Sequence, residues 1–189
     1  MVQSGGWLKR VAIFADVEPG AASALEALFK ERMFGRDDFI VSKESSGDSL
    51  FVVTEGRVKV VLYGQNGREV ILSTFKPGDF FGEMSLLDNQ PRSANVIAIE
   101  PSRLLVLDRA SFAKHLESHP KTALNVLAEM SRRLRRADAI IGNLALLDVY
   151  GRVARFLRDL ARTDGKPVTD GVEIASRPTQ AEIAAMVGT

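Results

Sequence analysis

The 189-residue sequence has no cysteine, which excludes disulfide bonds, thiolate metal sites, iron–sulfur clusters and cysteine nucleophiles together. It also lacks any apolar run near the roughly 18 residues that a membrane-spanning helix requires. Residues 1–10 lack the apolar stretch of a signal peptide. We therefore expect a cytoplasmic protein with no membrane partner. The net charge is −2 over residues 1–118 and +3 over residues 119–189, which indicates an anionic partner for the second part only weakly.

Histidine is almost as scarce, because His115 and His119 are the only two in the chain. Both lie in a segment of helical spacing that follows the β-rich region. Metal-dependent enzymes on small β-barrels need a cluster of histidines and a carboxylate on the strands. The order His-Leu-Glu-Ser-His also differs from the His-Glu-x-x-His of zinc hydrolases. We predict no metal site and no enzymatic activity, and we expect both histidines to be solvated.

The first two thirds of the chain change from a helical to a β-rich pattern. Residues 7–32 have helical spacing, interrupted by a turn at Pro19–Gly20. From Phe34 onward, short β-rich runs alternate with turns, and the Asn-Gly within residues 63–68 is typical of a hairpin. The predicted strands are 39–41, 50–53, 58–63, 70–73, 94–98 and 104–107. This pattern predicts an α+β protein with an antiparallel β jelly-roll barrel, and a β-sandwich fits the same pattern.

A long helix is predicted after the β-rich region. Residues 108–118 have helical spacing, and Pro120 then suits the first turn of a helix that continues to Leu147. Apolar residues repeat along it with the 3-4-3-4-3 spacing of a dimer seam: Leu127, Met130, Leu134, Ala137, Ile141 and Leu144. The alternative is a helix that packs on its own barrel. The flanking arginines 132, 133, 135 and 136 favour the dimer helix.

The remaining residues form a separate pattern. Asp148 interrupts the seam, and a new helix is predicted over 149–162, followed by a loop at 163–167 and a short strand at 172–174. Thr179 and Glu182 have the spacing of a capping box, which predicts a helix that begins there and ends at Gly188.

The segment from Phe80 to Ala94 carries the clearest chemistry. It joins a glycine and a carboxylate, Gly82 and Glu83, to Arg92 nine residues later. A carboxylate accepts hydrogen bonds from a sugar hydroxyl, a guanidinium forks onto phosphate oxygens, and Ser93 adds a hydroxyl donor. The segment therefore suits a ribose cyclic phosphate. From the spacing alone, an ordinary surface ion pair between Glu83 and Arg92 is the alternative.

This segment resembles the phosphate-binding cassette of cyclic-nucleotide-binding domains, with Phe81-Gly82-Glu83, an apolar pair, and Pro91-Arg92-Ser93-Ala94. The resemblance implies that Glu83 holds the ribose hydroxyl and that Arg92 and Ser93 hold the cyclic phosphate. The ligand-binding set that follows is Gly82, Glu83, Met84, Ser85, Arg92, Ser93, Ala94, Arg133, Ala137 and Asp138. In the cyclic-AMP receptor, the positions of Ala137 and Asp138 carry hydroxyl residues that contact adenine. Cyclic AMP is the expected effector, while cyclic GMP and a cyclic dinucleotide stay open.

Residues 130–134 and 142–152 are similar to the dimer helix and hinge of the cyclic-AMP receptor protein and fumarate–nitrate regulator superfamily. Residues 178–188 resemble the first helix of its winged helix-turn-helix domain. The resemblance implies a homodimer, DNA contacts near Thr179 and Gln180, a hinge at Asp148, and RNA polymerase as a further partner. The second, DNA-reading helix would begin beyond Thr189, so we expect a C-terminally truncated domain.

The expected organisation is a cyclic-nucleotide-binding β-roll domain with flanking helices over 1–118, a dimerisation helix over 119–147, and a partial winged helix-turn-helix domain over 148–189. Such a chain is expected to be a ligand-gated transcription regulator. One alternative is a regulator of the same fold that responds to cyclic di-GMP. Another is a cyclic-nucleotide module of a kinase or channel that does not bind DNA, although such a module has no need of the 179–188 helix.

Overall fold

The computed structural model describes residues 6–174 and 178–188. Its contacts divide the chain into two compact units, residues 1–62 with 72–131, and residues 63–71 with 132–189. Within the described residues, no helix is long and apolar enough to cross a membrane.

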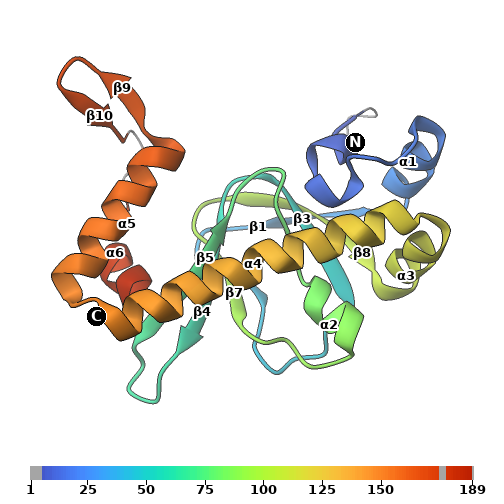
Figure 1. Ribbon diagram of the computed structural model, residues 1–189. Coiled ribbons are helices and arrows are strands. Elements are labelled where there is room, and N and C mark those ends of the chain that lie inside the picture. Colours follow the sequence, from blue (N-terminus) through green and yellow to red (C-terminus); the bar gives the residue numbers. More distant parts are fainter. Residues whose placement is uncertain (1–5, 175–177, 189) are drawn as a thin grey trace. The chain divides into compact units, whose positions relative to one another are not determined.

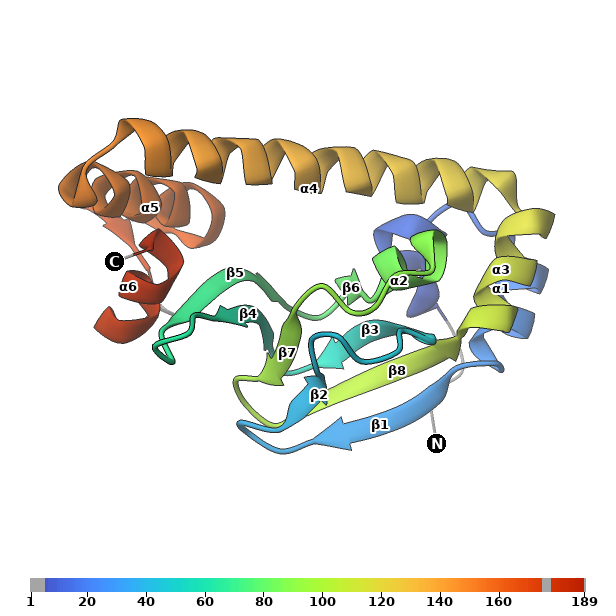
Figure 2. The same ribbon diagram turned by 90° about the horizontal axis from the view of Figure 1, so that it is seen from below.

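Two four-stranded antiparallel sheets confirm the jelly-roll expectation (Figure 2). Their strand orders are β1-β8-β3-β6 and β2-β7-β4-β5. The strands are β1 Lys30–Phe34, β2 Phe39–Val41, β3 Ser49–Glu55, β4 Val58–Tyr63, β5 Glu69–Phe75, β6 Phe80–Phe81, β7 Asn95–Ala98 and β8 Ser102–Asp108.

Strand β3 is buried on both faces, which explains its nearly continuous apolar sequence. Because successive side chains of a strand point to opposite faces, Leu50 and Val52 share one face and Phe51 and Val53 the other. The first pair belongs to a core cluster with the N-terminal segment and the following helices. The second pair belongs to a cluster between the sheets. One strand therefore joins both cores.

The prediction of a helical stretch over residues 7–32 is partly wrong. The segment forms two 3₁₀ turns, η1 Leu8–Arg10 and η2 Ala12–Phe14, and a short helix, α1 Pro19–Glu26. Residues 30–34 form the edge strand β1, in which Lys30 pairs with Val106 and Phe34 with Ser102. The run Lys-Glu-Arg-Met has good intrinsic helix propensity. Pairing with β8, more than 65 residues away in the sequence, outweighs it.

The predicted helices after the β-roll are confirmed as α3 Arg109–Ser118 and α4 Pro120–Leu146 (Figure 1). Asp108 caps α3 by accepting a hydrogen bond from the Ser111 amide. In the first half of α4, Val126 is buried and Met130 packs against the N-terminal core. Leu127 is 61% exposed. This part of α4 thus has one face on its own core and another open to solvent.

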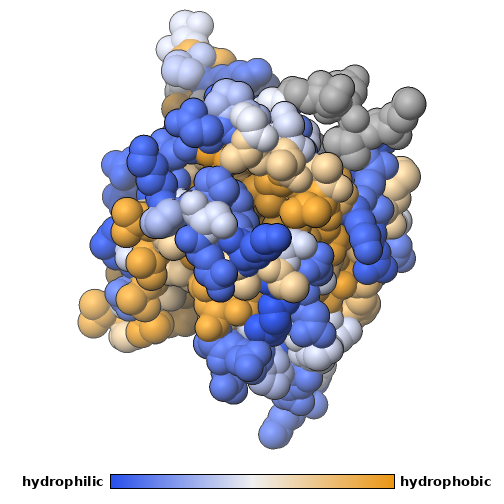
Figure 3. Space-filling model, turned by 90° about the vertical axis from the view of Figure 1, so that its right-hand side faces the viewer, coloured by the Kyte–Doolittle hydropathy of each residue, from blue (hydrophilic) through white to orange (hydrophobic). Residues whose placement is uncertain are grey.

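Apolar surface also occurs on the face that carries the N-terminal segment, α1 and α3, where it is interspersed with hydrophilic residues (Figure 3). Exposure of apolar side chains alone therefore does not identify an interface. The regular spacing along α4 is the more informative feature.

The second unit contains the end of α4, α5 Val149–Asp164, the hairpin of β9 Lys166–Val168 and β10 Gly171–Glu173, and α6 Gln180–Val187. The predicted loop at 163–167 is wrong, because α5 continues to Asp164 and Lys166 pairs with Glu173. The capping box is confirmed: the Glu182 amide donates to Thr179 Oγ1 over 3.2 Å. The Thr179 amide donates to Glu182 Oε2 over 2.7 Å.

Candidate functional site

The cassette, residues 80–94, begins with strand β6, after which the chain turns into the short helix α2, Glu83–Asp88. Gly82 is the N-cap of α2 and has a φ of 90°. A Cβ at this position would lie 2.6 Å from Arg92 Nη1 and 2.7 Å from the Ser49 carbonyl oxygen. Glycine is therefore required here both by the backbone conformation and by the close approach of Arg92.

The Arg92 side chain is buried and held in one orientation. Its exposed fraction is only 6%. Nη1 donates to the Gly82 carbonyl over 2.9 Å, and Nη2 donates to the Ser49 carbonyl over 2.7 Å. Burial lowers the pKa of the guanidinium from its usual value, and the charge of Arg109 lowers it further, whereas Asp48 and Glu83 oppose the change. The site thus holds a positive charge away from bulk water.

Glu83 is even more deeply buried, with an exposed fraction of 1%. The alternative of an ordinary surface ion pair is therefore wrong, because neither Glu83 nor Arg92 lies on the surface. Ser85 is also buried, at 3% exposure. The cassette thus contains a buried carboxylate, a buried guanidinium and a buried hydroxyl.

The other predicted cassette residues differ in exposure. Ala94 is buried, whereas Ser93 and Met84 are exposed. Arg133, Ala137 and Asp138 belong to the second unit. Ala137 and Asp138 are exposed on α4, and Arg133 is half-buried. Their contact with a ligand remains a prediction.

Three residues of the site were missed by sequence reasoning. Ser49 orients Arg92 through its backbone carbonyl, which carries no sequence signal. Gly47 lies against α2 so closely that a Cβ would meet Ser85 Cβ at 2.2 Å. Arg109 hydrogen-bonds to carbonyl groups of α2 and of residue 47. In the sequence, the run Ser46-Gly47-Asp48 indicates only a turn and gives no sign of a contact with the cassette.

The expectation that both histidines are solvated is wrong for His115, which is 7% exposed. Its Nε2 lies 3.1 Å from Thr122 Oγ1, and its ring stacks on His119 with centroids 4.3 Å apart. Burial lowers the pKa of His115 to about 4, with a further contribution from His119. Among the described residues no group of three or more potential metal ligands is present.

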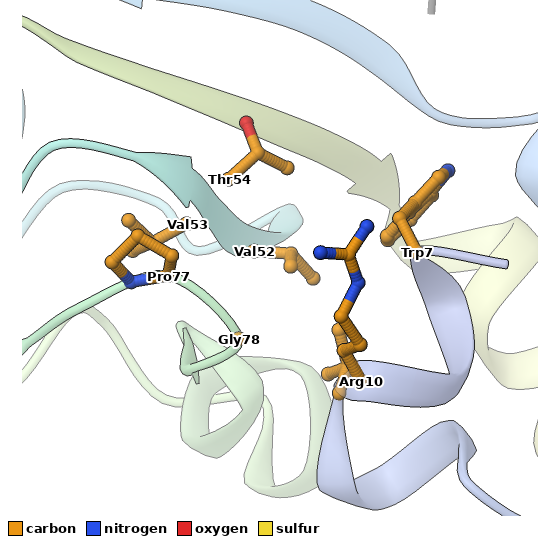
Figure 4. A pocket seen from close by; sticks show the side chains of 8 residues that line it. Trp7, Arg10, Val52, Val53, Thr54, Pro77 and Gly78 are labelled. Atoms are coloured by element: carbon orange, nitrogen blue, oxygen red, sulfur yellow. The ribbon is translucent and has the colours of Figure 1, made fainter. Parts of the chain in front are cut away.

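A separate pocket of about 180 Å³ lies beside the N-terminal segment (Figure 4). It is smaller than the roughly 300–1,000 Å³ of ordinary ligand pockets. None of the cassette residues contributes to it; it is lined by Trp7, Arg10, Val11, Val52, Val53, Thr54, Pro77 and Gly78. We therefore place the candidate site at the cassette.

The matching family model and the similar proteins agree with each other. A family model for the cyclic nucleotide-binding domain matches residues 31–119. The CRP-like cAMP-activated global transcriptional regulator of Mycobacterium tuberculosis is 33% identical over 181 residues, which cover 96% of this chain and 81% of that protein. The cAMP-activated global transcriptional regulator CRP of Escherichia coli O157:H7 is 33% identical over 151 residues, or 79% of this chain and 71% of that protein.

Solved structures of similar fold include the two that follow. The Thermus thermophilus catabolite activator protein matches with a TM-score of 0.65 and 30% identity, covering 94% of this chain and 80% of that one. The c-di-GMP responsive global regulator CLP of Xanthomonas campestris matches with a TM-score of 0.78 and 22% identity, covering 90% of this chain and 85% of that one. At that identity the second match supports the fold alone.

Proposed function

This chain belongs to the cyclic-AMP receptor protein and fumarate–nitrate regulator superfamily, and we propose on that premise that it is a transcription regulator gated by a cyclic nucleotide. The proposed parts are a nucleotide-binding domain over 1–118, a dimerisation helix over 119–147 and a DNA-binding domain from residue 148. The nucleotide binds at the cassette, and the signal passes along α4 to the DNA-binding part.

The observation that carries this proposal is the buried, oriented guanidinium of Arg92. A guanidinium has five N–H donors, of which two are used by the carbonyls of Gly82 and Ser49. Within the described residues the other three N–H groups have no hydrogen-bond partner, and we propose that they bind the anion from a direction that is fixed before it arrives. A fixed donor loses little conformational entropy on binding. Glu83 then accepts from the ribose hydroxyl, and Ser93 donates to the phosphate.

Cyclic AMP is the ligand that we propose first. Support comes from the relatives that are 33% identical, whose names describe them as cAMP-activated. At the base, Ala137 offers no side-chain hydrogen bond, while ionised Asp138 accepts one from an exocyclic amine such as that of adenine. Guanine also carries an exocyclic amine, so cyclic GMP and cyclic di-GMP are the alternatives that the experiment must separate.

We propose that the protein acts as a homodimer through the apolar seam of α4. Leu134 is 64% exposed and Ile141 is 63% exposed, at the heptad spacing from Leu127. Ala137 and Leu144 are also exposed. Met130 instead packs on the N-terminal core of its own chain, so it contributes less to this seam.

DNA is the proposed partner of the second unit. Asp148 is the proposed hinge, since it separates α4 from α5 and caps α5 by accepting from the Gly151 amide over 2.8 Å. Thr179 and Gln180 open α6, where the amide-rich end of a helix suits a DNA phosphate. The capped α6 favours a DNA-binding regulator over a nucleotide module without DNA. RNA polymerase follows as a further partner only if the DNA proposal holds.

The test is a calorimetric titration of the protein with cyclic AMP, cyclic GMP and cyclic di-GMP under identical salt conditions. We expect cyclic AMP to bind most tightly, with one nucleotide per chain. Tighter binding of cyclic di-GMP would replace the proposed ligand but keep the regulator. Absence of binding by all three nucleotides would contradict the proposed function.

A further inference from the structure

Arg109, the first residue of α3, makes an unusual set of contacts for a side chain outside the cassette. Nη1 donates to the Leu86 carbonyl over 3.1 Å. Nη2 donates to the Ser85 carbonyl over 3.0 Å and to the Gly47 carbonyl over 2.8 Å. The side chain is 33% exposed, so these bonds are partly shielded from water. One guanidinium therefore joins two separate backbone segments.

The carbonyls that Arg109 binds on α2 need an external partner. Ser85 and Leu86 are among the last four residues of α2, whose carbonyls have no partner within an α-helix. A cation at this end also offsets the partial negative charge of the helix terminus. A helix of six residues is far too short to be stable by itself. The position of α2 thus depends on contacts such as these.

Arg92 makes the matching contacts at the other end of α2. It joins the carbonyl of Gly82, the N-cap, to the carbonyl of Ser49. Arg109 at the start of α3 and Arg92 in the segment before β7 therefore attach the two ends of α2 to residues 47–49. The Arg109 amide also donates to the Asp48 carbonyl over 2.9 Å, which fixes the start of α3 to the same segment.

We infer that Arg109 is a positioning residue of the nucleotide site, an inference that rests on the proposed function. It holds the C-terminal end of α2 on residues 47–49, so that Glu83 and Ser85 stay in register with Arg92, and it does not touch the ligand. Lysine cannot replace it fully, because a single ammonium group lacks the planar fork that reaches three carbonyls.

The experiment compares Arg109→Ala, Arg109→Lys and the control Arg57→Ala in the intact protein. Arg57 is a suitable control because its ion pair with Glu100 is exposed and lies outside the cassette. Cyclic AMP affinity is measured by calorimetry, its dissociation rate by stopped flow, and the amide exchange of residues 83–88 by mass spectrometry.

We expect Arg109→Ala to weaken cyclic AMP binding about tenfold, as for a hydrogen bond to a charged group. The change is expected mainly in a faster dissociation rate. Amide exchange should accelerate in residues 83–88 and stay unchanged in β3 and β8. Arg109→Lys should recover part of both effects, and Arg57→Ala should match the wild type.

The outcomes separate this inference from the proposed function. Wild-type affinity and dissociation rate in Arg109→Ala would overturn the role of Arg109 and leave the proposed function intact. Faster exchange throughout β3 and β8 would show a general loss of stability and would also overturn a positioning role. If the wild type binds no cyclic nucleotide, the proposed function fails. Independently of that result, unchanged amide exchange at residues 83–88 in the Arg109 variants would refute the attachment of α2 by Arg109.

Discussion

Lowering the pH from 7.5 to 5.0 should destabilise the protein by about 2 kcal/mol through His115 alone. The pKa of this residue is about 4 in the fold, against 6.5 for a histidine in the unfolded chain. Well above pH 6.5 neither state binds the proton, and the full stability is present. As the pH falls from 6.5 towards 4, only the unfolded chain becomes protonated at this position, so unfolding becomes easier.

The magnitude follows from the separation of the two pKa values. One pKa unit corresponds to about 1.4 kcal/mol, so the loss approaches about 3 kcal/mol near pH 4 and then levels off. The cause is burial of the ring against Phe14 and beside Thr122, together with the neighbouring His119. Asp108, whose pKa is lowered by hydrogen bonds from Ser111, affects stability only near and below its usual value of 3.8.

Urea unfolding at pH 7.5 and pH 5.0 measures this effect in the wild type and in His115→Gln. Glutamine keeps an amide that can hydrogen-bond to the Thr122 hydroxyl but does not titrate. His119→Gln removes only the smaller contribution to the pKa of His115, so it should lose almost as much stability between the two pH values as the wild type does. The wild type should lose about 2 kcal/mol more than His115→Gln between the two pH values. An equal loss in both proteins would refute the reasoning.

Three further predictions concern the dimer helix, the hinge and the cassette. Leu134→Glu should give monomers in sedimentation experiments, whereas Arg135→Glu should leave a dimer. Asp148→Ala should lower the free energy of unfolding by about 1 kcal/mol in urea titrations, because it removes the cap of α5. Gly82→Ala should weaken nucleotide binding more than Gly142→Ala, because a Cβ at Gly82 would lie 2.6 Å from Arg92 Nη1 whereas the surroundings of Gly142 are open.

Features that depend on neighbouring residues could be predicted from the sequence. The Asn66-Gly67 turn is an example: Gly67 has a φ of 76°, and the Gly64 amide donates to the Arg68 carbonyl over 2.8 Å. The capping box of α6 is another, since Thr179 and Glu182 satisfy each other within one turn. In both cases the residues that determine the structure are close in the sequence.

Features that depend on distant partners could not be predicted. The edge strand β1 pairs with β8, and its own residues favour a helix. The burial of His115 depends on Phe14, which is about a hundred residues earlier in the chain. In the cassette, the pattern identified Glu83 and Arg92 as a pair of chemical groups. It could not identify Ser49 and Arg109, because their contacts involve backbone carbonyls that any residue possesses.

The most direct test of the proposed function compares the binding of cyclic AMP to Arg92→Ala and to Arg68→Ala by calorimetry. Arg92 is buried in the cassette, whereas Arg68 is an exposed arginine of the β4–β5 hairpin. Removing a charged hydrogen-bond donor from a phosphate costs about 1.5–3 kcal/mol, or roughly ten- to hundred-fold in affinity. Arg92→Ala should lose at least tenfold in affinity, and Arg68→Ala should bind as the wild type does. Equal affinities of the two variants would contradict the assignment of the nucleotide site to the cassette.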